Sequence, residues 1–294
     1  MGRSDNPALP TNPAGARVTA ARGGPFAFDE DLRLQADGPA AWTGRVSPAW
    51  NIGRNPNGGY LAAIAGRALQ HALASHPDPL SMTVHYLQPG LSGQPCRVAV
   101  QVLRSGRQLS TARATLLQDG SPRLEVLAAC GALADAGAAV AGPALSLDPP
   151  ELPAPDDCTG RSSDAQGVAL AILQRIDVRL HPGQAEPGAA GRAEVSGWIR
   201  FRDGREPDTL ACLLFADAFP PPVFGLLGAV GWVPTVELTV QVRARPAPGW
   251  VRGRFVTHDL VDGRLVEDGA LWDSEGKLIV QSRQLALLRR PPAG

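Results

Sequence analysis

The amino-acid sequence repeats itself, and this repeat constrains the fold more than any other feature. The word TVHYLQP at residues 83–89 returns as TVQVRARP at residues 239–246, where it is one residue longer. A glycine follows seventeen residues after the proline that ends each word, at Gly106 and at Gly263. Shared words that keep their spacing indicate an internal duplication, with two similar units in one chain.

Each unit has the pattern of one helix followed by antiparallel strands. Apolar residues over 61–72 recur at the i, i+3, i+4 and i+7 spacing of one helical face, directly after Gly58 and Gly59. Apolar and polar residues then alternate over 80–86, and again in the second unit over 236–243. Further strands of the first unit are predicted at 98–102, 109–118 and 124–130. One helix laid against an antiparallel sheet, formed twice, is an α+β architecture.

The composition divides the chain into four segments. A stretch rich in alanine, glycine, proline and asparagine begins the chain, and a proline-rich stretch without clear periodicity separates the two units. The predicted segments are a flexible arm at 1–24, the first unit at 25–133, a linker at 134–165 and the second unit at 166–290.

Charge and hydropathy argue against two classes of partner. Lys and Arg together number 28, as do Asp and Glu, so the formal net charge is zero. Nucleic-acid-binding proteins normally carry a basic excess or stripe, so no nucleic-acid partner is expected. The longest strongly apolar run, Val223–Val233, has about 11 residues, whereas a span needs roughly 20. No membrane association is expected.

Neither the cysteines nor the known phosphate- and metal-binding motifs predict a cofactor. The four cysteines, at 96, 130, 158 and 212, form no CxxC pair and no metal-ligand spacing, and we interpret them as reduced thiols of a cytoplasmic protein. The N-terminal residues lack the apolar core of a secretory signal, in agreement with a cytoplasmic location. The motifs G-x-S-x-G, G-x-x-x-x-G-K-[ST], G-x-G-x-x-G and H-E-x-x-H are absent, which argues against a serine hydrolase of the elbow type, a P-loop NTPase, a Rossmann dehydrogenase and a zincin. No metal or cofactor is expected.

One carboxylate has an unusual position, in the word FADAFPPP at residues 215–222. Asp217 lies between Phe215 and Phe219, and three prolines follow. It could cap the N-terminus of a helix that starts at the prolines. It could also act as a base, because apolar surroundings raise the pKa of a carboxyl group toward neutral pH. The two roles are compatible, and the residues alone leave both open.

Several words, taken in order, resemble those of bacterial acyl-CoA thioesterase II and its thioesterase-like relatives. These words are NGGYLAAIAGRAL (57–69), HYLQPG (85–90), LRSGRQLSTARATLLQDG (103–120), FADAF (215–219), VPTVEL (233–238) and GKLIVQSRQLALL (276–288). The resemblance spans about residues 40–290. It implies a double hotdog fold, an acyl-CoA substrate that is hydrolysed to free acid and CoA, and a homodimer or larger homo-oligomer.

The resemblance also implies a set of catalytic residues. The family uses an aspartate at the start of the second helix, a threonine entering the following strand and a glutamine on the last strand. The matching positions are Asp217, Thr235 and Gln284. Gln281 is an alternative match, but it lies three residues away and therefore on the opposite strand face. The strand after Thr235 reads LTVQVRARP where the family is rich in His and Trp, so a different substrate channel is expected.

These residue types suit the hydrolysis of a thioester. A threonine hydroxyl and a glutamine amide can hold a water molecule without adding charge. Backbone N–H groups at a helix N-terminus can stabilise an oxyanion, and the missing Cβ atoms of Gly58 and Gly59 would allow close approach there. Gly58, Gly59 and Tyr60 are therefore the predicted oxyanion and substrate-binding residues, although the glycines could serve close packing alone. Candidates for contact with the CoA phosphates are Arg104, Arg107 and Arg113.

Two other functions fit the same scaffold. A hotdog protein can bind an acyl group or an acyl-CoA without catalysis, because fold does not fix function, and this is the main alternative. A hydratase would need a catalytic histidine near a helix start, and neither predicted helix start carries one. His85 lies on the polar side of its predicted strand and is interpreted as structural or solvent-facing.

Overall fold

The computed structural model describes residues 25–135, 145–229 and 231–289. The arm expected at 1–24 and the centre of the expected linker, at 136–144, lie outside the described residues. Among the residues that are described, no helix has the length and apolar character needed to cross a membrane.

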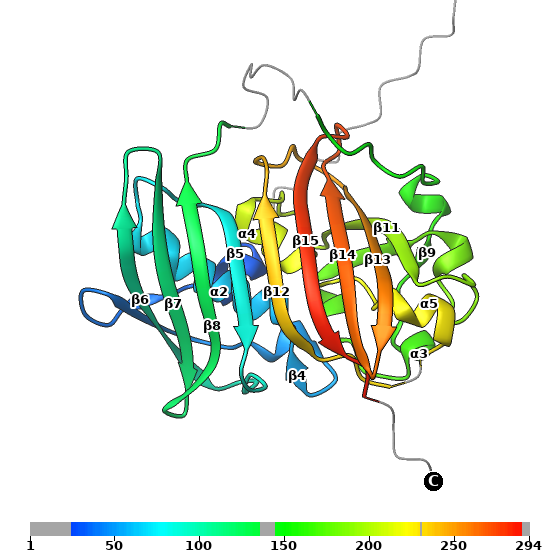
Figure 1. Ribbon diagram of the computed structural model, residues 1–294, viewed down its shortest axis with the longest axis horizontal. Coiled ribbons are helices and arrows are strands. Elements are labelled where there is room, and N and C mark those ends of the chain that lie inside the picture. The colour runs from blue at the N-terminus through cyan, green and yellow to red at the C-terminus, as the bar shows by residue number, and fades with distance from the viewer. Residues whose placement is uncertain (1–24, 136–144, 230, 290–294) are drawn as a thin grey trace, which may run out of the picture.

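A single sheet of thirteen antiparallel strands forms the main layer of the protein (Figure 1). From one edge to the other, the strands are β1 (Gln35–Ala36), β2 (Ala41–Arg45), β6 (Pro95–Ser105), β7 (Leu109–Gln118), β8 (Ser121–Gly131), β5 (Asp78–Tyr86), β12 (Thr235–Val242), β15 (Leu278–Leu287), β14 (Arg264–Trp272), β13 (Val251–Val261), β11 (Glu194–Phe201), β10 (Ile176–Leu180) and β9 (Thr159–Gly160). A separate small hairpin is formed by β3 (Asn51–Ile52) and β4 (Asn55–Pro56).

The order of the strands reveals the duplication. One half of the sheet runs β2-β6-β7-β8-β5 and the other runs β12-β15-β14-β13-β11, so corresponding strands lie equally far from the centre. The two repeated words begin on β5 and β12, which pair at the centre. Thr83 is opposite Thr239, with 2.9 Å between the two hydroxyl oxygens. This approximate two-fold symmetry confirms the double hotdog architecture expected from the sequence.

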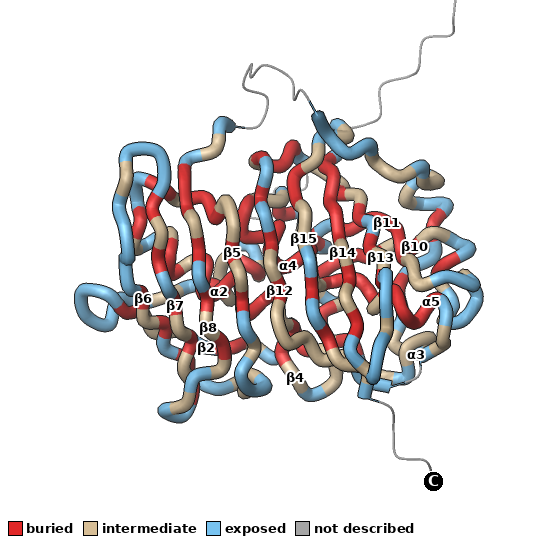
Figure 2. The backbone as a smooth tube through the Cα atoms, viewed as in Figure 1, coloured by how far each residue is buried: buried red, intermediate tan, exposed pale blue. Residues whose placement is uncertain are grey.

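The helices cover one face of the sheet, which we call the inner face. They are α1 (Ala27–Asp31), α2 (Gly58–Ala72), α3 (Ser163–Gln166), α4 (Thr209–Phe215) and α5 (Val223–Leu227), with short 3-10 turns at Pro48–Trp50, Pro155–Asp157, Ala171–Gln174 and Pro182–Gln184. Figure 2 shows the two central helices, α2 and α4, behind the sheet and largely buried. The predicted helix after the paired glycines is therefore confirmed as α2.

Small residues bring α2 and α4 close together. A Cβ atom on Gly59 would lie 2.6 Å from the backbone oxygen of Leu213, and one on Gly66 would lie 2.8 Å from a side-chain carbon of Leu210. The start of α2 therefore meets the end of α4, and the two helices run antiparallel. Any side chain larger than hydrogen at Gly59 would push against backbone.

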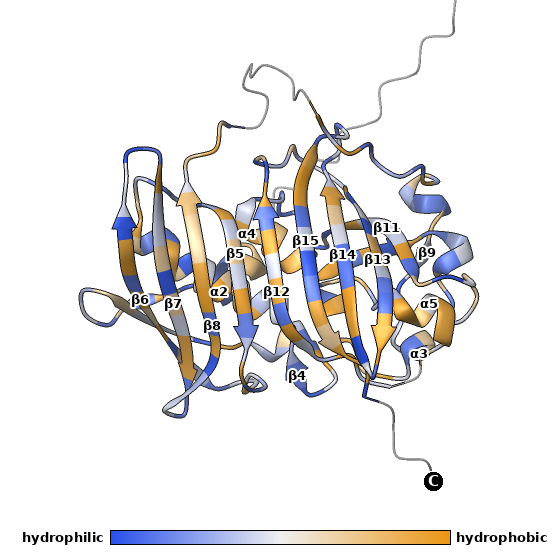
Figure 3. Ribbon diagram, in the orientation of Figure 1, coloured by the Kyte–Doolittle hydropathy of each residue, from blue (hydrophilic) through white to orange (hydrophobic). Residues whose placement is uncertain are grey.

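The strands alternate between the inner face and solvent, as the sequence predicts. On β7, the buried residues are Ser110, Ala112, Ala114, Leu116 and Gln118. Figure 3 shows hydrophobic and hydrophilic residues alternating along the central strands. The turn from β7 to β8 has φ of 51° at Asp119 and 68° at Gly120, which is the left-handed pair that a tight two-residue hairpin requires.

The second unit differs from the first in its helix. In place of one long helix it has α4, which ends at Phe215, and α5, which begins at Val223. The prolines at 220–222 separate the two, because proline lacks the backbone N–H that a continuing helix needs. Asp217 lies in this break, two residues beyond the end of α4. The prediction that Asp217 starts a helix is wrong.

The expected linker at 134–165 contains more structure than its composition suggests. Its second half forms a 3-10 turn, β9 and the start of α3, and β9 pairs with β10 to complete the sheet. The side chain of Arg161 is buried here, with 9% exposure. These elements are too short to produce a hydrophobic period, so sequence patterns could not reveal them.

Candidate active site

The carboxylate of Asp217 lies at the N-terminus of α2, a helix of the other unit. Its Oδ2 atom accepts a hydrogen bond from the backbone N–H of Gly59 at 2.9 Å and another from the Asn57 side-chain amide at 2.9 Å. The same amide donates to the backbone oxygen of Asp217 at 2.8 Å. The positive end of the helix dipole adds to these donors in stabilising the negative charge. Asp217 thus links the two units through these hydrogen bonds.

Asn57 both caps α2 and holds Asp217. Its Oδ1 atom accepts the backbone N–H of Tyr60 at 2.9 Å, which satisfies one of the free donors of the first helical turn. The Nδ2 group remains free to bind Asp217. Sequence reasoning missed this residue, although an asparagine directly before a helix start is a known capping signal.

Gly58 and Gly59 permit a close approach, but the group that approaches is Asp217. A Cβ atom on Gly58 would lie 3.0 Å both from Asp217 Oδ2 and from the hydroxyl of Tyr86. The N–H of Gly59 is hydrogen-bonded to Asp217, and the N–H of Gly58 also lowers the pKa of Asp217. The two glycines therefore hold the carboxylate. This corrects the prediction that their N–H groups are free to bind the oxyanion.

Tyr60 does not reach this site. Its ring is fully buried and stacks on Trp50, with 5.4 Å between ring centroids. Its hydroxyl accepts the backbone N–H of Ser47 and donates to the backbone oxygen of Asp31, both at 3.1 Å. The prediction that Tyr60 contacts the substrate is wrong, because the side chain fills the core of the first unit.

Thr235 faces the helices because of a β-bulge. Simple alternation along β12 would place Thr235 with Glu237 and Thr239 on the outer face. The pairing with β15 shifts between Thr235 and Glu237, so that Thr235 lies opposite Ala286, which is fully buried on the inner face. A bulge adds one residue to one strand and so changes the face on which the preceding residue lies.

Gln284 and Gln281 lie on opposite faces of β15, as expected. Gln284 is opposite the buried Leu238 and has 7% exposure, so it faces the helices. Gln281 is opposite the exposed Gln241 and lines a groove on the outer face. Of the two glutamines, Gln284 is the one on the same face as Thr235.

Two further polar side chains face Asp217 from the sheet. Tyr86 ends β5 beside the bulge, and its hydroxyl is buried without a hydrogen-bond partner among the described residues. Glu267 lies on β14 opposite Gln284 and has 8% exposure. Burial, followed by the charge of Asp217, raises the pKa of both groups. Asp217 therefore faces the stretch from β5 to β14 in which Thr235 and Gln284 point inward.

Opposing influences set the protonation of Asp217. Burial raises its pKa to about 6. The backbone N–H groups at the start of α2 and the charge of Arg161 lower the pKa and so limit this rise. The Arg161 guanidinium donates to the backbone oxygen of Ala218 at 2.6 Å and to the side chain of Gln166. Asp217 is thus mostly ionised at neutral pH yet basic enough to accept a proton. Sequence reasoning missed Arg161, since it belongs to the segment interpreted as a linker.

The polar groups of this cluster remain available to a ligand. Both hydrogen bonds that the described residues donate to the Asp217 carboxylate go to Oδ2, and none of these residues donates to Oδ1. The side chains of Thr235 and Gln284 form no hydrogen bond with any residue that the structure describes. Because buried polar groups in proteins are normally hydrogen-bonded, an inward-facing set of this kind fits a bound water molecule or a substrate carbonyl.

The histidines offer no acid–base group at this site. Their positions are as follows: His71 stacks on Trp42, His76 lies 3.0 Å from the Ser110 hydroxyl, His181 caps a 3-10 turn, and His85 and His258 are exposed. The hydratase alternative therefore lacks its catalytic group. In the described ranges, no three His, Cys, Asp or Glu side chains are grouped to hold a metal ion.

The three arginines considered for CoA binding lie away from Asp217. Arg104 and Arg107 belong to the β6–β7 hairpin, and Arg113 is exposed on β7. The backbone oxygen of Arg107 lies 3.4 Å from His76, just beyond the C-terminus of α2. A helix of the length of α2 spans about 22 Å, so this hairpin and Asp217 are at opposite ends of α2.

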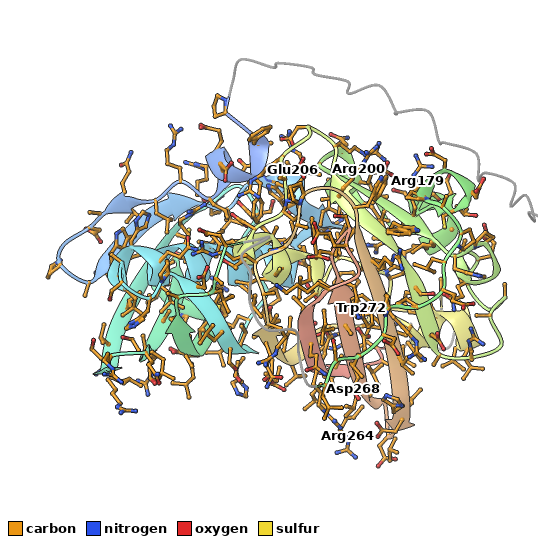
Figure 4. All side chains as sticks on the ribbon, turned by 90° about the horizontal axis from the view of Figure 1, so that it is seen from above. Arg179, Arg200, Glu206, Arg264, Asp268 and Trp272 are labelled. Carbon is orange, nitrogen blue, oxygen red and sulfur yellow. The ribbon has the colours of Figure 1, made fainter. Side chains whose placement is uncertain are left out.

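A wide groove of about 630 Å³ lies on the outer face of the sheet, across the neighbouring strands β12, β15, β14 and β13. Its lining includes Asp268 and Trp272, which point away from the helices (Figure 4). Neither Asp217 nor Gln284 contributes to it. The candidate active site is therefore the inner-face cluster at the start of α2, and the groove is a separate feature.

This fold and this cluster define a class of protein: a double hotdog protein with a partly buried carboxylate at a helix N-terminus and an amide and a hydroxyl facing it. Two family models match the sequence. The acyl-CoA thioesterase N-terminal domain matches residues 46–132, and the acyl-CoA thioesterase C-terminal domain matches residues 155–288. The chain belongs to the acyl-CoA thioesterase family, whose members are thioester hydrolases.

Individual relatives include one with a thioesterase assignment and one described by its hot dog fold. The structure resembles that of a provisionally assigned thioesterase II from Thermobifida fusca, with a TM-score of 0.78 and 31% identity over 90% of this chain and 98% of the other. It also resembles a conserved hot dog fold protein from Alicyclobacillus acidocaldarius, with a TM-score of 0.76 and 25% identity over 91% and 100%. An uncharacterised protein of Mycobacterium tuberculosis is 30% identical over 267 residues, which cover 83% of this chain and 90% of the relative.

Proposed function

We propose that this protein hydrolyses an acyl-CoA thioester to the free acid and CoA, and that Asp217, Thr235 and Gln284 orient the attacking water. The observation that carries the proposal is the setting of Asp217. Its Oδ2 atom is fixed at the start of α2, and its Oδ1 atom, to which no described residue donates, shares the inner face with the hydroxyl of Thr235 and the amide of Gln284.

In this mechanism Asp217 Oδ1 accepts one proton of the water as its oxygen attacks the thioester carbonyl carbon. The amide of Gln284 donates to the water oxygen, and the hydroxyl of Thr235 accepts its second hydrogen. The carbon–sulfur bond then breaks, and CoA leaves as a thiolate. Because a thiol has a pKa near ~8.5, this leaving group needs little help from a general acid. The proton held by Asp217 passes to solvent or to the thiolate, which restores the carboxylate.

The test is release of free thiol from acyl-CoAs of increasing chain length, with Asp217→Asn and Gln284→Ala as the critical variants. Asp217→Asn keeps an acceptor for Gly59 but loses the base, so kcat should fall at least about 100-fold. Gln281→Ala is the matched control for Gln284→Ala, because it removes the same amide from the outer face of the same strand. Full activity in Asp217→Asn would exclude this residue as the base.

Binding without turnover would support the alternative, a protein that carries an acyl group or acyl-CoA. It would appear as thermal stabilisation by acyl-CoA while no thiol is released. We also expect a homodimer or larger oligomer, which light scattering measures. Pairing through the sheet edges is not favoured, because the edge strands β1 and β9 have two residues each and offer few free backbone groups.

A further inference from the structure

Glu267 is a buried acid that the proposed mechanism does not use. It lies on the inner face of β14, opposite Gln284 on β15 and opposite Thr257 on β13. Residues directly opposed on one sheet face have Cβ atoms about 4.5–5.5 Å apart, so the Glu267 and Gln284 side chains can reach each other. The Thr257 hydroxyl on the other side is buried without a partner among the described residues. The Glu267 carboxyl likewise forms no hydrogen bond with a described residue.

The surroundings of Glu267 are poor in positive charge. From the helix layer it faces Asp217, beyond which lie Tyr86 and Arg161. Helix α5 packs on the neighbouring Leu265 and carries no titratable side chain. Arg254 and His258 of β13 and Arg283 of β15 line the outer groove instead, as does Asp268 of β14 itself. Burial, then the charges of Asp217 and Asp268, raises the pKa of Glu267 to about 8.

We propose that Glu267 is a positioning residue for the reaction: as a neutral acid it donates a hydrogen bond to the carbonyl oxygen of Gln284 and turns the Gln284 NH2 group toward the water. The inference rests on the proposed thioesterase function. A protonated carboxyl group can donate, whereas a carboxylate can only accept. When Glu267 ionises, the Gln284 amide must rotate to offer its NH2 group to Glu267, and the water loses its donor.

This arrangement predicts how activity depends on pH. Below about 6, Asp217 becomes protonated and cannot act as the base, so kcat falls as pH decreases. Above about 8, Glu267 loses its proton and Gln284 turns away, so kcat falls as pH increases. The two carboxyl groups interact, so the two limits belong to the pair. The expected profile of kcat is bell-shaped.

Two substitutions separate donation from charge. Glu267→Gln keeps the shape and a donor but cannot ionise, so it should retain kcat at pH 7 within about threefold and lose the alkaline decline. Glu267→Leu removes the donor, so kcat should fall about tenfold or more at every pH, with a smaller change in KM. A wild-type alkaline decline in Glu267→Gln, or wild-type kcat in Glu267→Leu, would overturn the proposal.

A second measurement does not depend on turnover. The side-chain amide resonance of Gln284 should shift with a midpoint near pH 8 in the wild-type protein, and should not shift in Glu267→Leu. An amide that does not titrate, or that titrates equally in Glu267→Leu, would refute the role of Glu267 even in an active enzyme. A titrating amide in a protein that releases no thiol from any acyl-CoA would support the contact and refute the proposed function.

Discussion

At the scale of single residues, Asp217 is held in a compromise between charge and burial. A carboxylate taken out of water becomes more basic, while hydrogen bonds and positive charge reverse that effect. The N–H groups at the start of α2 and the buried Arg161 provide the reversal, and the resulting pKa of about 6 keeps the group ionised at neutral pH. Removal of the N–H donors or of Arg161 should therefore change the pH range in which the protein is active.

The first prediction at this scale concerns Arg161. Arg161→Gln removes a charge that lowers the pKa of Asp217, so that pKa should rise above about 6. Because the base must be deprotonated, the acidic limb of kcat/KM should move to higher pH, and activity should fall more at pH 6 than at pH 8. A rise of one pKa unit lowers the rate on that limb about tenfold.

The measurement is the pH profile of thiol release by the two arginine variants. Arg161→Lys is the control, because it keeps the positive charge and should leave the limb near its wild-type position. An acidic limb that stays in place in Arg161→Gln would show that Arg161 does not tune Asp217.

At the scale of elements, two interruptions create the site. The break between α4 and α5 places Asp217 at the end of a short helix, and the bulge in β12 turns Thr235 to the inner face. A continuous helix would bury position 217 in a regular turn, and a regular strand would expose Thr235. The elements around these points are regular, so the candidate catalytic residues lie where regular structure stops.

The contrast between regular elements and their interruptions explains which features the sequence could predict. The strand β7 and helix α2 follow from hydrophobic periods, and the faces of Gln281 and Gln284 follow from strand parity. The face of Thr235 does not, because a bulge depends on the register with β15 and leaves no local pattern. Arg161 and Glu267 are ordinary charged residues in the sequence, and only tertiary contacts bring them near Asp217. The capping signal at Asn57 was present, but its contact with Asp217 links distant positions.

The prediction at this scale tests the contact between α2 and α4. Gly59→Ala would place a Cβ 2.6 Å from a backbone oxygen of α4, which cannot move aside, so the helices must separate. Overpacking of this kind costs about 1–3 kcal/mol, and the shift would also displace Asp217. We expect lower stability in urea and a loss of thiol release of more than about tenfold.

Gly66→Ala is the matched control on the same helix. Its Cβ would meet the end of the Leu210 side chain, which can adopt another rotamer, and the site lies two turns away. This variant should lose less stability and keep its activity. Equal loss of activity in both variants would show that Asp217 does not depend on close packing at Gly59.

At the scale of the whole molecule, the two-fold symmetry creates two helix starts, and the protein uses them differently. The start of α2 holds Asp217 through one carboxylate oxygen, and no described residue donates to the other. The start of α4 lies near Asp78, which accepts hydrogen bonds from the Thr209 hydroxyl at 3.3 Å, the Leu133 N–H at 2.8 Å and the Arg245 guanidinium at 3.0 Å. Both oxygens of Asp78 accept hydrogen bonds, so among the described residues the contact at the start of α4 is structural, and the candidate active site lies at the start of α2.

The last prediction compares the two aspartates. The pKa of Asp217 in the folded protein, about 6, lies above its ordinary value of 3.8, so the folded state binds this proton more tightly than the unfolded state. The contribution of Asp217 to stability is therefore present at about pH 4, is lost as the pH rises to about 6, and stays lost above. The difference corresponds to about 3 kcal/mol. Asp217→Asn should thus be more stable than the wild type at pH 7.5 but not at pH 4, while losing activity.

Asp78→Asn should show the opposite behaviour. It weakens a buried ion pair with Arg245, which is partly exposed, and should cost about 2 kcal/mol at pH 7.5 while leaving kcat within about threefold of the wild type. Urea unfolding at both pH values and thiol release from the same samples provide the comparison. Destabilisation of Asp217→Asn at pH 7.5 would contradict the raised pKa of Asp217. Loss of activity in Asp78→Asn, as in Asp217→Asn, would contradict a purely structural role for the start of α4.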